Sequence, residues 1–176
     1  MKKILFLSIL LFSITESVKP QDYINPLDFR LQLSGTFGEL RSNHFHAGID
    51  LKTKGVEGQK VYSIADGYVS RIKSSSYGYG KAIYITHYDG KTSVYAHLQE
   101  FSVKIDTIIK KQQYKREKFD INVFLKKDSI KVKQGEVIAL SGNSGSSGGA
   151  HLHFEIRDTE TEHPLNPLDY GFKVID

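Results

Sequence analysis

Short runs of β-branched and aromatic residues, separated by turn signals, constrain the fold of this chain most strongly. Ala82–His87 and Thr92–Leu98 flank Asp89-Gly90, and Val61–Ile72 is interrupted by Asp66-Gly67. Asp-Gly between such runs is typical of hairpin turns. Further runs of the same kind are Leu31–Phe37, Val137–Leu140 and His151–Ile156. The pattern predicts a mainly β protein, either an antiparallel sandwich or an open barrel.

One segment, residues 104–131, departs from this alternation of short strand-like runs and turns. It holds nine Lys or Arg residues and four Asp or Glu residues, so it carries a larger positive charge than the whole chain, whose net charge is +4. The segment is either a basic surface that holds an anionic polymer or a solvated insertion with a small apolar seam. Because a charged run is usually a solvated face, we favour the insertion.

Within this insertion the pattern indicates a short helix followed by a strand. Asp106 or Thr107 is expected to cap the helix, which would run to about Lys118. Three isoleucines would lie on one side of it: Ile105, Ile108 and Ile109. Ile121–Leu125 then has the composition of a strand.

The first residues predict a secretory signal peptide. Lys2 and Lys3 precede the apolar run Ile4–Ile14, which is too short to span a bilayer, and Ser17 suits a cleavage site. The alternative is a buried N-terminal helix or strand. We expect a signal peptide at 1–17, an N-terminal lead-in at 18–33 and a folded domain at 34–176. The protein would then be exported to the periplasm or the cell surface, with no membrane span in the mature chain.

The chain has no cysteine, so a transition-metal site would need nitrogen and oxygen ligands. His46 and Asp50 are four residues apart, and His151 and His153 are two apart, so on a strand each pair lies on one face. Gly48 would mark a bend where the backbone comes close to another group. Two histidines, a carboxylate and an open position for water form a catalytic zinc site. Only one of His151 and His153 needs to bind the metal.

The remaining four histidines have less specific surroundings. His97 follows a strand and supplies an imidazole that can accept a proton near neutral pH or, when charged, stabilise an oxyanion. We expect His44 beside the ligands or on the surface, His87 in a structural role at a turn, and His163 in a loop. Each short motif alone is more often a chance pair, so the prediction rests on their occurrence together.

Several segments keep one consistent order between about Ser34 and Tyr170. They are His46-Ala-Gly-Ile-Asp50-Leu51, Ala65-Asp-Gly-Tyr-Val69, Val94-Tyr-Ala-His97-Leu98, Gly135-Glu-Val-Ile138, Gly142-Asn-Ser-Gly-Ser-Ser-Gly-Gly-Ala-His151-Leu-His-Phe-Glu155 and Asn166-Pro-Leu-Asp-Tyr170. In this order they resemble the M23 zinc metallopeptidases, also called the lysostaphin or LytM type.

The resemblance implies a fold, an activity and a set of site residues. The fold would be the LytM-type β-sandwich or open barrel with a short helical insertion. One zinc ion would be bound by His46, Asp50 and His153, and His97 and His151 would act as catalytic histidines beside the bound water. The substrate would be peptidoglycan, cut in its stem peptides or cross-bridges. We expect no nucleic-acid partner, and a regulatory protein partner is left open.

Two departures from the family pattern affect the substrate groove. The insertion at 104–131 is longer than the usual loop after the His97 strand and is expected near the rim of the groove. The region before His46 is shorter than in many members, so groove-wall residues are not transferred; Arg41, Asn43 and Tyr95 are candidate substrate contacts.

Two other functional classes compete with the peptidase interpretation. A LytM-type domain that lacks catalysis binds the wall or activates another wall hydrolase, but all five metal and catalytic positions are filled here. A carrier or phosphotransfer domain is the second alternative, because Ala65-Asp-Gly-Tyr-Val69 faintly resembles biotinyl and lipoyl carriers. The export signal and the missing attachment lysine argue against that alternative.

Overall fold

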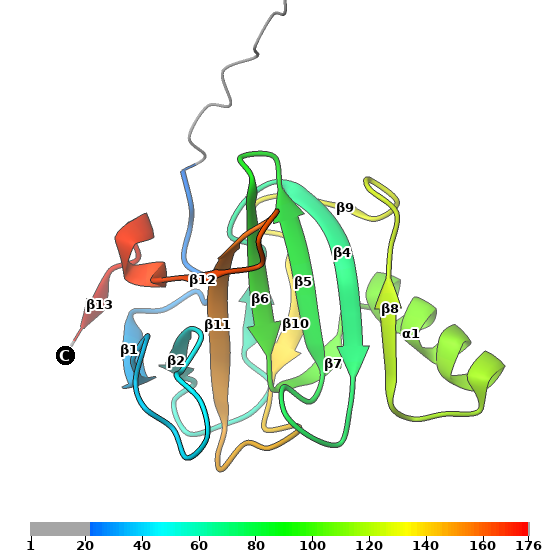
Figure 1. The fold of residues 1–176 in the computed structure, drawn as a ribbon, viewed down its shortest axis with the longest axis horizontal. Helices are drawn as coiled ribbons and strands as arrows, with labels where there is room; N and C mark the ends of the chain where they lie inside the picture. Colours follow the sequence, from blue (N-terminus) through cyan, green and yellow to red (C-terminus); the bar gives the residue numbers. More distant parts are fainter. Residues whose placement is uncertain (1–21, 176) are drawn as a thin grey trace, which may run out of the picture.

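The computed structural model describes residues 22–175, in which β-strands predominate (Figure 1). The predicted signal peptide at 1–17 lies outside the described residues. The strands are β1 (Leu31–Gly35), β2 (Ile49–Lys52), β3 (Lys60–Tyr62), β4 (Gly67–Ser74), β5 (Ala82–His87), β6 (Lys91–Ala96), β7 (Leu98–Phe101), β8 (Ile121–Phe124), β9 (Lys131–Val132), β10 (Val137–Ser141), β11 (His151–Asp158), β12 (Pro164–Leu165) and β13 (Val174–Ile175). The helices are α1 (Val103–Arg116) and the 3-10 turn η1 (Pro167–Tyr170).

The strands form one large sheet and one small sheet. The large sheet has the order β13-β1-β2-β11-β6-β5-β4-β8, with β12 beside β11 and β9 beside β4, and the small sheet has the order β3-β10-β7. The β1–β13 pair is parallel, whereas the other strand pairs of the described chain are antiparallel. The sheet is open rather than a closed barrel, and the predicted mainly β fold class is confirmed.

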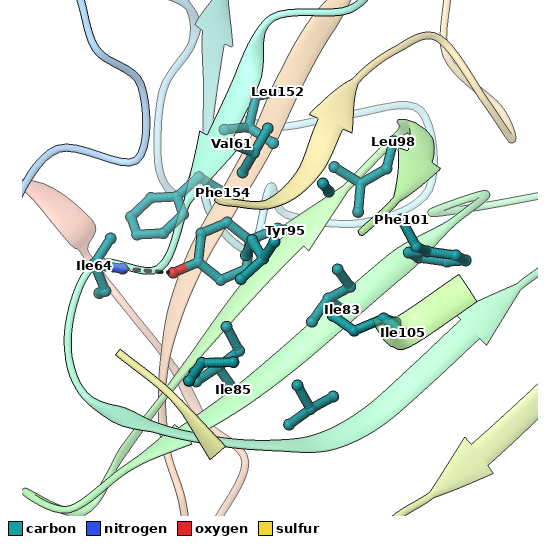
Figure 2. Close-up of a cluster of buried hydrophobic side chains, with 14 of the residues drawn as sticks. Val61, Ile64, Ile83, Ile85, Tyr95, Leu98, Phe101, Ile105, Leu152 and Phe154 are labelled. Carbon is teal, nitrogen blue, oxygen red and sulfur yellow. Dashed lines mark hydrogen bonds between the residues drawn. The ribbon is translucent and has the colours of Figure 1, made fainter. Parts of the chain in front are cut away.

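The core lies between the two sheets (Figure 2). Strand alternation explains which side chains enter it. On β11, Leu152, Phe154 and Ile156 are fully buried in the core, so the alternate residues project from the opposite face of the large sheet. On β2, Leu51 likewise enters the core, which leaves Asp50 and Lys52 on that opposite face. The predicted metal ligands Asp50 and His153 therefore lie on this second face.

One of the two predicted hairpins forms and the other does not. β5 and β6 pair across Asp89-Gly90, as the turn signal indicated. At Asp66-Gly67 the flanking strands β3 and β4 separate into different sheets. The Asp66 carboxylate accepts hydrogen bonds from the Gln134 backbone and the Lys133 ammonium, both at 2.8 Å, so this dipeptide forms a corner between the sheets.

The insertion at 104–131 is part of the fold. Helix α1 begins at Val103, earlier than expected, with Ser102 as its N-cap residue. Ile105 and Ile109 are buried and Ile108 packs against them, as predicted, and β8 extends the large sheet as its edge strand beside β4. The apolar seam is larger than expected, because further insertion residues also enter the core, namely Ile121, Val123 and Ile130.

The described part of the predicted lead-in also packs on the domain. Leu27 and Leu31 are buried in the core, and the Tyr23 ring stacks on Tyr170. Residues 22–30 therefore belong to the same packed unit as the strands. Among the described residues, no helix has the length and apolar character needed to cross a membrane.

Candidate metal centre

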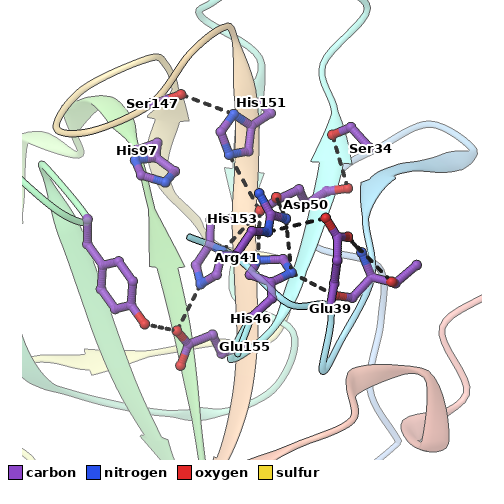
Figure 3. Close-up of polar contacts among 12 residues, drawn as sticks. Ser34, Glu39, Arg41, His46, Asp50, His97, Ser147, His151, His153 and Glu155 are labelled. Carbon is purple, nitrogen blue, oxygen red and sulfur yellow. Dashed lines mark hydrogen bonds and ion pairs between the residues drawn. The ribbon is translucent and has the colours of Figure 1, made fainter. Parts of the chain in front are cut away.

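Three ligand atoms meet at one point on the polar face of the large sheet (Figure 3). His153 Nδ1 lies 3.0 Å from His46 Nε2 and 3.0 Å from Asp50 Oδ1, and His46 Nε2 lies 3.1 Å from Asp50 Oδ1. All three residues are buried. The pairing of β2 with β11 sets this arrangement, because Asp50 and His153 are directly opposite each other.

The chemistry of these atoms fits a cation. The Nδ1–H of His46 donates to the Thr36 carbonyl at 2.8 Å, and the Nε2–H of His153 donates to Glu155 Oε1 at 2.8 Å. The nitrogens that face each other therefore carry lone pairs, beside a carboxylate oxygen. Three such acceptors repel unless a positive charge lies among them. In a tetrahedral zinc site with bonds of about 2.0–2.1 Å, the ligand atoms are roughly 3.3 Å apart, close to the spacing here.

Each ligand is held by a further group that fixes its orientation. Glu155 is fully buried and also contacts Arg157 at 2.6 Å and the Tyr79 hydroxyl. Arg41 Nη2 donates to Asp50 Oδ2 at 2.8 Å, which leaves Oδ1 facing the two histidines. Such partners set the tautomer and direction of metal ligands.

The pKa values of the ligands reflect this clustering of charge. Burial opposes ionisation of Asp50, yet its hydrogen bonds to His151, His153 and His46 hold its pKa far below the ordinary range. Burial also disfavours a charged His153, but hydrogen bonds to Asp50 and Glu155 raise its pKa to about 9. Without a metal, the His153 ring therefore holds the positive charge in this site, as a bound proton.

Two further imidazoles lie beside the ligands. His151 Nε2 is 3.5 Å from Asp50 Oδ1, and the His97 and His151 ring centroids are 4.8 Å apart. The Nδ1–H of His97 donates to the Ser144 carbonyl and that of His151 to the Gly149 carbonyl, both at 2.8 Å. In both rings Nε2 is therefore the basic nitrogen. Burial lowers the pKa of His97 to about 4, so its ring is neutral near pH 7.

These side chains line a cavity of about 250 Å³. Its walls are Arg41, His44, His46, Asp50, Gly78, Tyr79, His97, Ser146, Ser147, Gly148, His151 and His153. The loops at 75–81 and 142–150 form one wall, where the Gly78 N–H donates to Ser146 Oγ and the Ser146 N–H donates to the Gly78 carbonyl, both at 2.9 Å. All five predicted metal and catalytic residues are brought together in this cavity.

The loops touch through glycine backbones. A Cβ atom on Gly80 would lie 2.4 Å from Ser144 C, and one on Gly145 would lie 2.3 Å from Gly80 N. Both residues also have positive φ angles, 62° and 74°. At Gly48 a Cβ atom would lie 2.2 Å from the Phe154 carbonyl oxygen, so the predicted close backbone approach is confirmed.

The three predicted substrate contacts have different surroundings. Arg41 lines the cavity while it binds Asp50, so a contact with substrate stays a prediction. Asn43 is exposed, bonds its Oδ1 to His44 Nδ1 at 2.6 Å and does not line the cavity. The prediction for Tyr95 is wrong, because its side chain is fully buried and its hydroxyl accepts a hydrogen bond from the Ile64 N–H at 3.1 Å (Figure 2). Strand alternation on β6 sends Tyr95 to the core.

The other histidines lie where the sequence indicated. His44 is exposed at the mouth of the cavity, and His163 lies in the loop before β12. His87 is buried, with Nδ1 3.0 Å from the Asp66 carbonyl and Nε2 2.8 Å from Ser93 Oγ, which is a structural role.

Sequence reasoning missed the residues that support the ligands. Glu155 belongs to the His151–Glu155 motif, and its position two residues after His153 was the available signal for a shared face. Tyr79 and Ser144 had no such signal, because they lie in loops whose contacts with Glu155 and His97 depend on the folded chain.

Comparisons with known proteins agree with this geometry. The sequence model of Peptidase family M23 matches residues 44–114 and 120–167, more than half of the chain. The DD-carboxypeptidase/endopeptidase Mpg of Neisseria meningitidis serogroup B is 31% identical over 150 residues, which cover 82% of this chain and 28% of that protein. The murein hydrolase activator NlpD of Escherichia coli is 34% identical over 135 residues, which cover 77% of this chain and 28% of that protein.

A comparison with solved structures also finds a peptidase with a similar fold. The zinc containing peptidase from Vibrio cholerae superposes with a TM-score of 0.59 at 25% identity, over 82% of this chain and 39% of that chain. The chain thus corresponds to under a third of the two curated relatives and to under half of the solved one.

Proposed function

Because the chain belongs to peptidase family M23, we propose that it is a zinc metallo-endopeptidase that hydrolyses peptide bonds in peptidoglycan stem peptides or cross-bridges. The observation that carries the proposal is the convergence of His46, Asp50 and His153 with His97 and His151 in one cavity. A ligand triad alone would fit a structural metal. Two imidazoles with basic nitrogens beside it fit catalysis.

Zinc, when bound, would polarise the scissile carbonyl and lower the pKa of a water molecule. His46 and His153 would hold it through Nε2 and Nδ1, and Asp50 through Oδ1. His97 and His151 are the groups that would take up the proton of the water and stabilise the oxyanion. Their Nδ1–H bonds to backbone carbonyls keep Nε2 in the basic form at a fixed position.

A non-catalytic role is the second candidate, and one observation favours it. NlpD, named as a murein hydrolase activator, has a slightly higher identity than the endopeptidase Mpg, 34% against 31%, over a shorter stretch of the chain, 135 against 150 residues. In that role the domain would bind the wall or a partner hydrolase without turnover. The complete set of metal and catalytic side chains supports the peptidase instead, since an activator has no need of Nε2 atoms beside a metal site.

The proposed substrate also implies where in the cell envelope the protein works. A protein that acts on peptidoglycan works in the periplasm or at the cell surface, and both curated relatives carry names from peptidoglycan metabolism. A regulatory protein partner is part of this proposal only in the activator role.

Two measurements test the proposal together: cleavage of purified peptidoglycan, and the zinc content of the purified protein. We expect about one zinc ion per chain and release of peptide fragments, and we expect His97→Ala and His151→Ala each to slow the release by a factor of about 10²–10⁴. Absence of zinc, or unchanged cleavage by both variants, would refute the peptidase. Stimulation of a second hydrolase without cleavage by this protein alone would identify the activator.

A further inference from the structure

A second cavity, of about 630 Å³, adjoins the metal centre. Its lining residues are Gln32, Ser34, Lys52, Lys54, Gly55, Gly149, Ala150 and His151. His151 also lines the metal cavity, so the two cavities share this side chain; the second cavity is called the groove below. Ser34, one of these lining residues, lies beside Asp50, and its hydroxyl contacts the Asp50 backbone carbonyl at 3.4 Å (Figure 3).

The register of β2 and β11 places Lys52 next to His151, one of the two proposed catalytic histidines. On the β2–β11 ladder Asp50 is opposite His153, and Lys52 is opposite His151. Because alternate residues share a face, Lys52 projects from the same face as Asp50, beside the catalytic imidazole. Its Cα is about 7 Å along β2 from that of the metal ligand, or roughly two residues of an extended peptide.

The groove carries positive charge that the described residues do not neutralise. Lys52 and Lys54 are both exposed, and neither forms an ion pair within residues 22–175. Lys54 Nζ lies 4.3 Å from the centroid of the Phe29 ring, which holds this ammonium in place while leaving its N–H groups available. None of the residues that line the second cavity is a carboxylate.

We propose that Lys52 and Lys54 form a subsite for a free carboxylate of the substrate peptide, one or two residues from the bond that is cleaved. This inference rests on the proposed peptidase function. A carboxylate is the anionic group that a peptide offers, either at its C-terminus or on an acidic residue, and charge-assisted hydrogen bonds from ammonium groups would bind it. The polar uncharged residues Gln32 and Ser34 also line this cavity. The subsite would make the enzyme select peptides whose carboxylate is free over those in which it is amidated.

The test uses two synthetic stem peptides that differ only in this carboxylate, free in one and a carboxamide in the other. For the zinc-loaded protein we expect kcat/KM to be about tenfold higher for the free acid, the size of one charged hydrogen bond. Lys52→Gln should remove most of this preference through a higher KM for the free acid, and Lys52→Glu should reverse it. Lys60→Gln is the matched control, since Lys60 is also an exposed strand lysine but lies on β3, outside the groove lining.

A binding measurement keeps this inference separate from the peptidase proposal. Titration of both peptides into the protein, followed by NMR, should show tighter binding of the free acid that Lys52→Gln removes and Lys60→Gln keeps. If the peptides are not cleaved but this difference persists, the peptidase proposal fails and the subsite stands. Equal binding and equal cleavage of the two peptides, or a preference that Lys52→Gln retains, would overturn the subsite.

Discussion

His151 and His153 project from the same face of β11, yet their rings meet different neighbours. His153 Nδ1 lies 3.0 Å from both other ligand atoms, whereas His151 Nε2 lies 3.5 Å from Asp50 alone. The spacing in the sequence predicted the shared face but left open which histidine binds the metal, and the family resemblance assigned it to His153. The tautomers were not predictable, because they depend on the Glu155 carboxylate and the Gly149 carbonyl.

The two histidines should respond differently to removal. We expect His153→Ala to lose zinc, because one of three ligands is gone and an empty space is left among buried polar atoms. His151→Ala should retain zinc and lose a factor of about 10²–10⁴ in kcat, the usual contribution of a proton-transfer group. Metal analysis after dialysis and peptide turnover measure the two effects. If both variants lose the metal equally, this division of roles is wrong.

Glu155 gives a second prediction at this scale. Glu155→Gln keeps the shape of the side chain but removes the charge that orients the His153 ring, so zinc affinity should fall by about 10–100-fold. Competition with a zinc chelator measures it. Glu160→Gln is the control, because Glu160 is exposed in the turn after β11. The zinc affinity of this variant should equal that of the unchanged protein. Equal affinity in both variants would show that Glu155 does not tune the ligand.

His87 predicts a dependence of stability on pH away from the metal. Burial lowers its pKa below the ordinary 6.5, so the unfolded chain binds a proton first as the pH falls. The free energy of unfolding should therefore decrease below about pH 6.5, with a slope of at most about 1.4 kcal/mol per pH unit from this one group. Urea unfolding of metal-free protein and of its His87→Gln variant between pH 7.5 and 5.5 measures both slopes. The difference between them is the part due to His87, because His97 and His153 also have shifted pKa values in this protein. A variant with the same slope would contradict this origin.

At the scale of elements, the loops at 75–81 and 142–150 hold His97, one of the two proposed catalytic histidines, in place. The Ser144 carbonyl binds the ring, and Ser144 Oγ donates to the Leu98 carbonyl at 2.8 Å and accepts from the Lys81 N–H at 3.0 Å. The sequence predicted the Ser- and Gly-rich loop before β11. It could not predict which glycines are packed against backbone, since that contact joins segments some 65 residues apart.

Gly145→Ala should separate these loops. The added Cβ would lie 2.3 Å from the Gly78 carbonyl oxygen, at a φ of 74°, so we expect a loss of about 2–4 kcal/mol in the free energy of unfolding. Chemical denaturation measures the loss. Gly149→Ala in the same loop is the control, because its Cβ would meet no atom within 4 Å, and it should change stability by less than about 0.5 kcal/mol. Comparable losses in both variants would contradict the packing argument.

At the scale of the whole molecule, the large sheet separates two kinds of surface. One face packs against the small sheet and α1, and the other carries the candidate metal centre and the groove beside it. The alternation of residues along β2 and β11 made this division predictable. The partition of β3 and β4 into different sheets was not, because Asp66-Gly67 has the composition of a hairpin turn and the corner depends on Gln134, far along the chain.

The account's central claim is that this whole arrangement hydrolyses peptide bonds of peptidoglycan with a metal held by His46, Asp50 and His153. Mass spectrometry of defined muropeptides incubated with the zinc-loaded protein, the metal-free protein and His153→Ala tests it most directly. We predict products of peptide-bond hydrolysis with the zinc-loaded protein, none with the other two, and recovery when zinc is returned to the metal-free protein. Intact muropeptides with the zinc-loaded protein, or equal cleavage by all three, would contradict the claim.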